Sequence, residues 1–334
     1  MNNKVILDIL GGDNAPGVTL DGATLALKKD PTLNLVLIGD ESKIKAHFDR
    51  NSALIKRIEI IHTTTNIEMS EKPTDAIRQK PDSSIVLGMD ALKSREDCVA
   101  FVSAGSTGAV LTGAFMKVGR IQGVSRPALS AMLPTIDKRG VLVLDLGANM
   151  DCKGINLAHF ALMADVYMRE RGIEKPRIAL LSVGTEDEKG NELTHEAFAI
   201  LKTLPINFVG NMEARDAFSG NYDIIVTDGF AGNVMLKTME GTGKLFSKSL
   251  RRALSCPFLL PAKLMLAPRL LKMKKSLSED ATGGAVFLGI KKPVIKAHGS
   301  SNSIAVMNAV LLGARAGNMN LNEKIQSALA QMPQ

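Results

Sequence analysis

Tryptophan is absent from the 334-residue sequence, and aromatic residues make up only 4% of it. Few aromatic side chains are therefore available as stacking platforms for single-stranded nucleic acid. The sequence also lacks helix-turn-helix, zinc-finger and RNA-binding signatures, so we expect no nucleic-acid partner. The formal net charge of +7 points instead to an acidic protein, an anionic substrate or a membrane surface.

Cysteine is scarce as well, since the chain contains only Cys98, Cys152 and Cys256. Three cysteines do not make a disulfide framework, and no Cys-x-x-Cys pair suggests a zinc site. The first residues, Met-Asn-Asn-Lys, lead directly into an apolar segment and lack the apolar core and cleavage site of a signal peptide. These features predict a cytoplasmic protein in a reducing compartment.

Short apolar runs alternate with helix-like segments, and hydrophobic residues make up 45% of the chain, as in an ordinary globular enzyme. The alternation predicts an α/β fold with a mostly parallel sheet covered on both faces. We expect one catalytic unit over residues 1–334 with a central cleft, because such sheets bind ligands outside the carboxyl ends of their strands. The expected strands are residues 4–10, 33–38, 58–62, 99–103, 140–146, 177–183, 222–227 and 294–297, and the expected helices include 16–29, 84–92 and 304–316.

A glycine-rich loop follows the strand expected at 99–103. Gly105 and Gly108 flank two hydroxyl residues, Ser106 and Thr107, and helix-forming residues come next. Glycines let backbone N–H groups turn toward one point, and the N-terminus of the following helix adds a partial positive charge. The loop is thus either an anion cradle or an ordinary strand-to-helix turn with Thr107 as its N-cap.

Other expected strands also open into loops that combine a glycine, a carboxylate and an amide. We expect several of these exits at one edge of the sheet, where they would line a cleft with fixed polar groups and lysines. Their polar residues are Gly11, Gly12 and Asp13; Asp145, Asn149, Asp151 and Lys153; Glu186 and Lys189; Asp228, Asn233 and Lys237; and His298, Ser300 and Ser301.

The acidic residues of these loops have two interpretations. Asp145, Asp151 and Asp228 could bind a divalent cation, or they could hold lysines and loop amides in place. We favour the second, because no other feature requires a metal. We expect neither a metal nor a cofactor.

Protein nucleophiles are poorly supplied. No Gly-x-Ser-x-Gly elbow occurs, and Cys152 beside Lys153 is either a thiolate nucleophile or, more often in such a position, a small packed residue. Walker and dinucleotide fingerprints are also missing. Loop amides, hydroxyls and lysines suit a reaction whose nucleophile is itself a substrate. Phosphate is such a nucleophile, and it could attack an acyl carbonyl whose oxyanion is stabilised by lysine and backbone donors.

Residues 245–277 differ in composition from the rest of the chain. No acidic residue occurs between Glu240 and Glu279, and basic residues alternate with leucine, methionine and phenylalanine. Prolines interrupt the segment too often for a spanning helix. A basic, leucine-rich helical pair can lie in a membrane interface, or it can pack as a helical hairpin at a dimer interface. The candidate contact residues are Arg251, Arg252, Phe258, Leu259, Lys263, Leu264, Leu270, Leu271 and Lys274.

Seven blocks of the sequence closely resemble the phosphate acyltransferase (PlsX) family of bacterial phospholipid synthesis. They occur in family order and cover nearly the whole chain, at residues 8–16, 103–108, 145–153, 189–192, 210–216, 228–234 and 298–302. The chain departs from the family pattern at Leu10, Ser106 and Thr185, where the family usually has methionine, asparagine and glutamate.

The resemblance implies transfer of a fatty acyl group from acyl carrier protein to inorganic phosphate, which gives acyl phosphate. It also implies a three-layer α/β/α fold like that of isocitrate and isopropylmalate dehydrogenases, with a protruding basic amphipathic helical segment. Members of the family are usually homodimers that associate peripherally with the membrane. They supply acyl phosphate to a membrane glycerol-3-phosphate acyltransferase.

We assign residue roles on the hypothesis that the acyl group moves directly to phosphate. Phosphate would be held by Ser103, Gly105, Thr107 and Gly108, and Lys189 would stabilise the oxyanion or the departing thiolate. Asn149, Asp228 and Asn233 would order the cleft, and His298, Ser300 and Ser301 would line its far wall. Further substrate-binding candidates are Gly11, Gly12, Asp13, Ser106, Asp151, Lys153, Glu186, Asn211, Arg215 and Lys237.

Two other functions compete with acyl transfer. A nicotinamide- and metal-dependent decarboxylating dehydrogenase would share the implied fold, but the sequence lacks a dinucleotide fingerprint. A non-catalytic membrane scaffold built around residues 245–277 would form no acyl phosphate. In the acyltransferase hypothesis, Arg251 and Arg252 belong to the surface that docks the acidic carrier protein.

Overall fold

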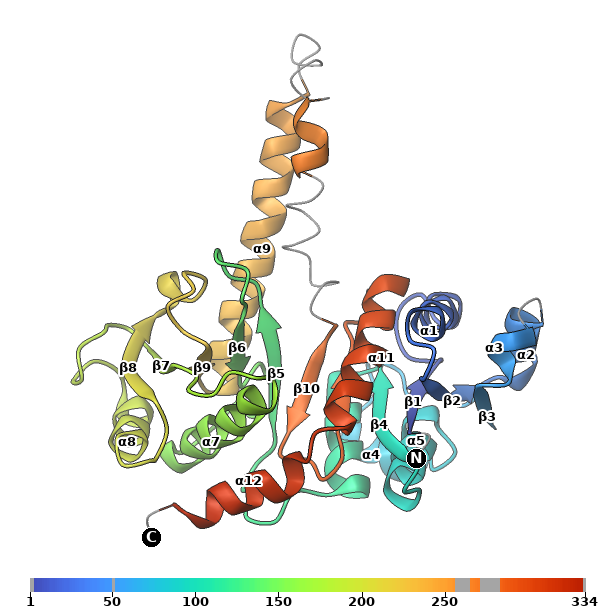
Figure 1. Ribbon diagram of the computed structural model, residues 1–334, viewed down its shortest axis with the longest axis horizontal. Helices are drawn as coiled ribbons and strands as arrows, with labels where there is room; N and C mark the ends of the chain where they lie inside the picture. The colour runs from blue at the N-terminus through green and yellow to red at the C-terminus, as the bar shows by residue number, and fades with distance from the viewer. Residues whose placement is uncertain (1–2, 50–51, 256–264, 271–282, 333–334) are drawn as a thin grey trace.

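The computed structural model describes residues 3–49, 52–255, 265–270 and 283–332. Within these ranges the strands form one 11-stranded sheet, in the order β3-β2-β1-β4-β11-β10-β5-β6-β9-β7-β8 (Figure 1). The strand bounds are β1 Lys4–Asp8, β2 Asn34–Gly39, β3 Ile58–His62, β4 Cys98–Ser103, β5 Ala128–Leu133, β6 Val141–Leu144, β7 Ile178–Ser182, β8 Phe208–Glu213, β9 Ile224–Val226, β10 Ala285–Leu288 and β11 Val294–Lys296.

Strand direction divides this sheet into two halves. β3, β2, β1, β4 and β11 are parallel to one another, and so are β6, β9, β7 and β8. Between the halves, β10 is antiparallel to both β11 and β5, and β5 is antiparallel to β6. Three successive antiparallel pairings reverse the strand direction. The prediction of one shared edge is therefore wrong, because β1, β4 and β11 end at one edge and β6, β7 and β9 end at the other.

Alternate strand residues face two separate hydrophobic cores. In β1, Val5 and Leu7 pack into one core and Ile6 into the other, as the two-residue period of a strand requires. The first core is closed by α1, α7, α8, α11 and α12, and the second by α4, α5 and α6. Helices thus cover both faces of the sheet, which confirms the three-layer α/β/α prediction.

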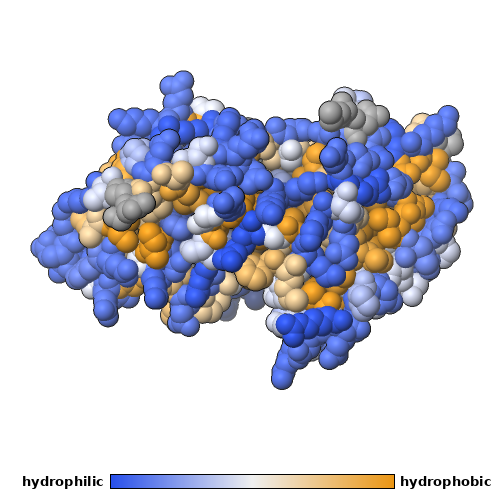
Figure 2. Space-filling view, turned by 90° about the horizontal axis from the view of Figure 1, so that it is seen from below, coloured by the Kyte–Doolittle hydropathy of each residue, from blue (hydrophilic) through white to orange (hydrophobic). Residues whose placement is uncertain are grey.

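The helices occupy the following ranges: α1 Gly17–Lys29, α2 Glu41–Phe48, α3 Ser52–Ile55, α4 Pro73–Gln79, α5 Ser84–Ser94, α6 Thr107–Gly113, α7 Gly154–Glu170, α8 Glu192–Leu201, α9 Gly229–Ala253, α11 Ser303–Gly317 and α12 Leu321–Ala330. Seen from below, the molecular surface is mostly hydrophilic, and hydrophobic patches show between the polar side chains in both halves (Figure 2).

Helix α9 projects from the body of the molecule (Figure 1). It begins at Gly229, inside the fold, and runs continuously to Ala253, so residue 245, at which the predicted basic segment begins, lies within the helix. Residues 265–270 are also helical, and Leu270 lines the same cavity as Leu250 and Leu254 of α9. Of the predicted contact residues, Arg251 and Arg252 are exposed on the last turn of α9. Apart from Leu270, the remaining predicted contact residues lie outside the described residues; they are Phe258, Leu259, Lys263, Leu264, Leu271 and Lys274.

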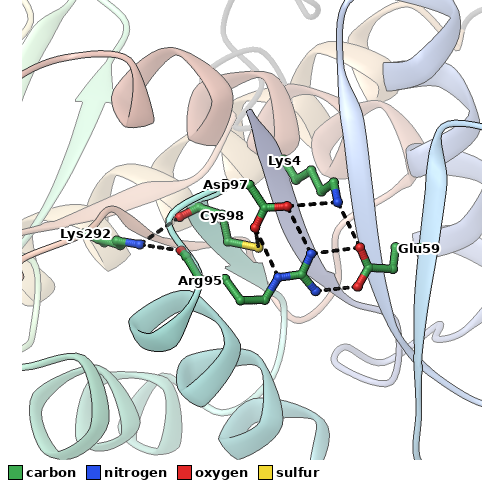
Figure 3. A network of polar contacts seen from close by, with 6 residues as sticks. All are labelled: Lys4, Glu59, Arg95, Asp97, Cys98 and Lys292. Carbon is green, nitrogen blue, oxygen red and sulfur yellow. Dashed lines mark hydrogen bonds and ion pairs between the residues drawn. The ribbon is translucent and has the colours of Figure 1, made fainter. Parts of the chain in front are cut away.

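A charge network ties β1, β3 and β4 together at their amino ends (Figure 3). The Lys4 ammonium lies 2.9 Å from both the Glu59 and the Asp97 carboxylates, and the Arg95 guanidinium pairs with the same two carboxylates. The pKa of Glu59 is lowered to about 2, and the hydrogen bond from Arg95 makes the largest contribution. The network lies at the sheet edge opposite to the glycine-rich loop.

Candidate active site

The loops that follow β1 and β4 interlock around a buried carboxylate. Asp8, at the end of β1, accepts hydrogen bonds from the backbone N–H groups of Leu10 and Gly11 and from the Ser103 hydroxyl, at 3.0, 3.2 and 2.7 Å. Ser103 in turn accepts the Gly105 N–H at 2.9 Å. The Ser103 hydroxyl is thus engaged within the protein, and it shapes the predicted cradle. Asp8 was not among the predicted site residues, because its partner in the other loop lies 95 positions away.

The two loops approach each other so closely at Gly11 that a side chain does not fit there. A Cβ atom on Gly11 would lie 2.6 Å from the Gly105 nitrogen and 2.7 Å from the Asp8 carboxylate, distances that no real side chain tolerates. The loop after β11 joins the same cluster, since the Asp13 N–H donates to the Gly299 carbonyl at 2.8 Å. The structure therefore brings the predicted residues of the β1, β4 and β11 exits together. We call these three loops the anion-side loops.

The polar residues of the anion-side loops differ in their exposure to solvent. Ser106 is buried and is the N-cap of α6, without a side-chain capping bond, and Thr107 is the first helical residue rather than the cap. The His298 Nδ1 atom lies 3.2 Å from the Ser300 backbone nitrogen and 2.9 Å from the Ser300 hydroxyl, so its ring is held against the loop. His298 and Ser300 are exposed, whereas Ser301 is buried.

A second cluster forms where β6 and β9 end. The buried Asp145 carboxylate accepts the N–H groups of Leu129 and Ala148 and both the backbone and side-chain N–H groups of Asn149. Burial raises the pKa of Asp145, and these hydrogen bonds act in the opposite direction. Asp228 caps α9 by accepting the Ala231 N–H at 2.8 Å. The Asp145 carboxylate thus holds loop amides, and the Asp228 carboxylate holds an amide of the first turn of α9.

The second cluster is closed by backbone contact between its two loops. The Gly229 N–H donates to the Asn149 carbonyl at 2.8 Å, and a Cβ atom on Gly147 would touch the side chain of Asn233. Asn149 also donates to the Pro127 carbonyl at 2.8 Å. Asn149 therefore orders the loops through its amide group, and Asp151 and Lys153, which follow it, are exposed.

The loop after β7 carries Lys189 and is anchored at its base. The Lys189 carbonyl accepts the Ser182 hydroxyl at 3.1 Å and the Asn211 side-chain amide at 3.4 Å. Asn211 also donates to the Glu186 carbonyl at 2.8 Å. Its Oδ1 atom is buried without a partner. The Lys189 side chain is exposed, and no ion pair of its ammonium occurs within the ranges that the structure covers.

Two predicted basic site residues have acidic partners. The Lys237 ammonium lies 2.8 Å from both carboxylate oxygens of Glu240, and Arg215 pairs with Glu213. Their charges are thus partly neutralised within the protein. We call the exits of β6, β7 and β9, with Lys189, Asp228 and Asn233, the acyl-side loops.

A cavity of about 1890 Å³ adjoins the acyl-side loops. It lies between α9 and the loops that follow β5, β7 and β8. Polar groups such as Ser182, Arg215 and Asp228 line one part of it, and the rest of the lining is mainly apolar, including Phe218, Phe230, Met235, Met239, Phe246 and Leu250.

The described cysteines do not behave as nucleophiles. Cys152 is half-buried, its Sγ lies 3.7 Å from the Asn149 carbonyl, and burial raises the pKa of its thiol to about 11. Cys98 is buried at the opposite end of the fold, and burial raises its pKa to about 11 as well. Both thiols therefore stay protonated at neutral pH, which agrees with the interpretation of Cys152 as a packed residue. Cys256 lies outside the described residues.

Neither a metal-binding cluster nor a membrane-spanning helix occurs among the residues that the structure covers. No group of three or more histidine, cysteine, aspartate or glutamate side chains has the arrangement of a metal site there. The helices in these ranges are also too short or too polar to span a bilayer.

The fold is that of phosphotransacylases. A branched-chain phosphotransacylase from Enterococcus faecalis V583 matches 95% of this chain and 100% of that chain, with a TM-score of 0.62 at 14% identity. The EutD phosphotransacetylase from Staphylococcus aureus matches 95% and 94%, with a TM-score of 0.61 at 17% identity. A 4-hydroxythreonine-4-phosphate dehydrogenase from Klebsiella pneumoniae reaches a TM-score of 0.54 at 14% identity over 95% and 100% of the two chains. Similarity at such low identity shows the fold alone.

Sequence relatives identify the family. A family model described as "Fatty acid synthesis protein" matches residues 3–324. The phosphate acyltransferase of Halalkalibacterium halodurans is 44% identical over 332 residues, which are 98% of this chain and 97% of the relative. That of Bacillus cereus strain B4264 is 45% identical over 309 residues, 92% of each chain. The chain therefore belongs to the phosphate acyltransferase family of fatty acid synthesis proteins, and it is an acyltransferase. The dehydrogenase alternative is not favoured.

Proposed function

We propose that the protein transfers a fatty acyl group from acyl carrier protein to inorganic phosphate, and that the acyl phosphate supplies phosphatidic acid synthesis. The observation that carries this proposal is the interlocked set of anion-side loops. Their close-packed glycines and the N-terminus of α6, which has no side-chain cap, suit a small anion. Family membership supports the same reaction.

The reaction is a direct acyl transfer. A phosphate oxygen attacks the thioester carbonyl carbon and forms a tetrahedral oxyanion, and the carbon–sulfur bond then breaks. The carrier thiolate leaves and takes a proton, while the new carbon–oxygen bond remains in acyl phosphate. Positioned N–H groups and a lysine stabilise the oxyanion where its charge develops.

Each set of loops binds one of the two substrates. In this proposal the anion-side loops hold phosphate, and the acyl-side loops hold the thioester. The two sets end at different sheet edges, but adjacent strands of a sheet are rotated by about 20–25°. The path from β4 to β9 crosses five such steps, so the strand direction turns by roughly 100–125°. This twist supports an arrangement in which both sets face one side of the molecule and share a cleft.

The protonated state of the described thiols supports transfer without an acyl-enzyme. A single-turnover experiment tests this step. Acyl carrier protein charged with a fatty acyl group is mixed with excess enzyme in the absence of phosphate. Direct transfer predicts no release of the carrier thiol until phosphate is added, and a burst of free thiol without phosphate would contradict it.

Lys189 is the proposed source of positive charge at the thioester. Its backbone is anchored by Ser182 and Asn211, so the loop is positioned while the ammonium stays available to substrate. We expect Lys189→Ala to lower kcat by about 100-fold, the effect of losing one oxyanion donor. Lys202→Ala is the matched control, because Lys202 pairs with Asp187 of the same loop at 2.5 Å. Near-normal turnover of Lys189→Ala would overturn this role.

The basic end of α9 is the proposed dock for the carrier protein. Lys244, Lys248, Arg251 and Arg252 are exposed there, and their charge is complementary to an acidic partner. Reversing it with Arg251→Glu and Arg252→Glu should raise the KM for the acyl carrier protein and leave the KM for phosphate unchanged. An equal effect on both substrates would argue against a docking role.

Helix α9 also supports proposals for the assembly and the membrane. Near its base, Phe230 and Val234 are 64% and 50% exposed, and farther out Leu245 and Phe246 are 66% and 61% exposed. We propose that a second copy of the chain covers the base and the adjoining cavity, and that the outer part lies on an anionic membrane surface. There it would deliver acyl phosphate to a membrane glycerol-3-phosphate acyltransferase.

A further inference from the structure

A buried lysine lies among the anion-side loops and was not among the predicted site residues. Lys296 is the last residue of β11, it stands beside Ser103 of β4 in register, and it is only 8% exposed. Its ammonium donates to the carbonyls of Ala104, at 3.5 Å, and of Ala297. Ala104 belongs to the glycine-rich loop itself, so the ammonium lies inside the cluster of loops.

This ammonium has no paired carboxylate within the described residues. Asp8 and Asp13 are near enough to act on its charge, but neither forms an ion pair with it. Asp8 is already engaged by two backbone N–H groups and the Ser103 hydroxyl. Burial lowers the pKa of Lys296 to about 8 against the pull of both carboxylates. A buried cation with only neutral acceptors is costly, and an anion bound beside it would remove that cost.

We propose that Lys296 binds the phosphate substrate and supplies its charge partner in the anion-side loops. This inference rests on the proposed function, since it assigns one residue to the phosphate of that reaction. Phosphate would lie between the Lys296 ammonium and backbone N–H groups of the glycine-rich loop. The carbonyls of Ala104 and Ala297 would hold the ammonium in place before phosphate arrives.

The same strand pair provides a matched control. Lys292 stands just before the amino end of β11, and its ammonium donates to the carbonyls of Arg95 and Cys98 at 2.7 and 3.1 Å (Figure 3). Both lysines thus donate to two backbone carbonyls, but they lie at opposite edges of the sheet. Only Lys296 lies among the anion-side loops.

The test compares Lys296→Gln, Lys296→Arg and Lys292→Gln with the wild-type enzyme. Glutamine keeps an N–H donor for the backbone carbonyls and removes the charge, and arginine keeps the charge. We expect Lys296→Gln to raise the KM for phosphate by about tenfold or more, with the KM for the acyl donor within about twofold of wild type. Lys296→Arg should recover part of the loss, and Lys292→Gln should leave both constants unchanged.

Three results would overturn the inference: an unchanged phosphate KM in Lys296→Gln, equal losses in the glutamine and arginine variants, or an equal loss in Lys292→Gln. Titration calorimetry with inorganic phosphate gives an independent readout. If the wild-type enzyme forms no acyl phosphate, the proposed function fails. Lys296 is then still tested, because weaker phosphate binding in the glutamine variant alone would support its role and equal binding would refute it.

Discussion

At the scale of single residues, Gly11 is a position where the anion-side loops leave no space for a side chain. We expect Gly11→Ala to destabilise the protein by about 1–3 kcal/mol, the cost of overpacking, and to raise the KM for phosphate. The physical reason is the contact of 2.6 Å that the new Cβ would make with the Gly105 nitrogen. Urea unfolding and steady-state kinetics measure the two effects.

Gly17, six residues further along, is the control for this prediction. It is the first residue of α1, and a Cβ there would meet nothing within 4 Å. Gly17→Ala should therefore leave activity unchanged and stabilise the fold by about 0.4–1 kcal/mol through the unfolded chain. If both alanine variants behave alike, the close approach of the two loops is not what Gly11 provides.

Asp228 has a structural role that can be separated from its predicted role at the site. Asparagine is an equally good N-cap, so Asp228→Asn should keep the stability of the protein, whereas Asp228→Ala should lose about 1 kcal/mol. Asp40→Ala, which removes the cap of α2, should cost a similar amount without lowering activity. An Asp228→Asn variant with full turnover would restrict Asp228 to capping.

Residue types and spacing predict the loops of the candidate site, and they suggest that Asp145 and Asp228 hold backbone amides, as the hydrogen bonds of both carboxylates show. They did not reveal that the Ser103 hydroxyl points inward, because its acceptor, Asp8, is far away in sequence. A related reason hides Lys296 from sequence reasoning. In the sequence it is the end of a short apolar strand, and its burial among three loops appears only when β11 is placed beside β4.

At the scale of elements, the direction of β5 and β10 decides where the strand exits lie. Local patterns predict most of the strands and helices, but β5, β8 and β10 are not among the expected strands. β8 reads Phe-Val-Gly-Asn-Met-Glu, which lacks both a continuous apolar run and clean alternation. Strand direction depends on which strands pair, and pairing is a long-range property, so the sequence pattern could not reveal that the sheet reverses.

The charge network at the amino ends of β1, β3 and β4 predicts a specific acid sensitivity. The folded pKa of Glu59 is lowered from its usual 4.5 to about 2, mainly by the hydrogen bond from Arg95. Its stabilising contribution is therefore complete above pH 4.5 and is lost as the pH falls toward 2. Glu59→Gln should unfold with a shallower pH dependence in that window, and at pH 7 it should be less stable by at most about 1 kcal/mol, because the group is partly exposed.

Urea unfolding of wild type and Glu59→Gln between pH 2 and 7 checks this prediction. In 1 M salt the difference at pH 7 should shrink, since partly exposed charges are screened. Parallel pH curves for the two proteins would show that the network does not set the acid sensitivity.

The two contacts proposed for α9 involve different parts of the helix: its base would contact a second copy of the chain, and its outer part would contact the membrane. Leu245→Asp, on the outer part, should abolish sedimentation with phosphatidylglycerol-containing vesicles and preserve the mass of the assembly. Val234→Asp, at the base, should lower that mass in light scattering. Vesicle binding that survives Leu245→Asp while the assembly dissociates would assign the outer part to the dimer instead.

At the scale of the whole molecule, the three-layer α/β/α architecture followed from alternating strand and helix patterns and from the family resemblance. The shared fold with a dehydrogenase explains why that function was a reasonable alternative. Function resides in the loops rather than in the fold. The loops here carry the proposed anion site, and burial raises the pKa of the two described cysteine thiols to about 11. The central claim is therefore that the protein forms acyl phosphate.

Mass spectrometry of the reaction product tests that claim most directly. The purified full-length protein is incubated with long-chain acyl carrier protein and inorganic phosphate, with acyl coenzyme A as the comparison donor. The account predicts an acyl phosphate that appears only when phosphate is present, in amounts equal to the free carrier protein released. Release of carrier protein without acyl phosphate, or no reaction of the acyl carrier protein at all, would contradict it.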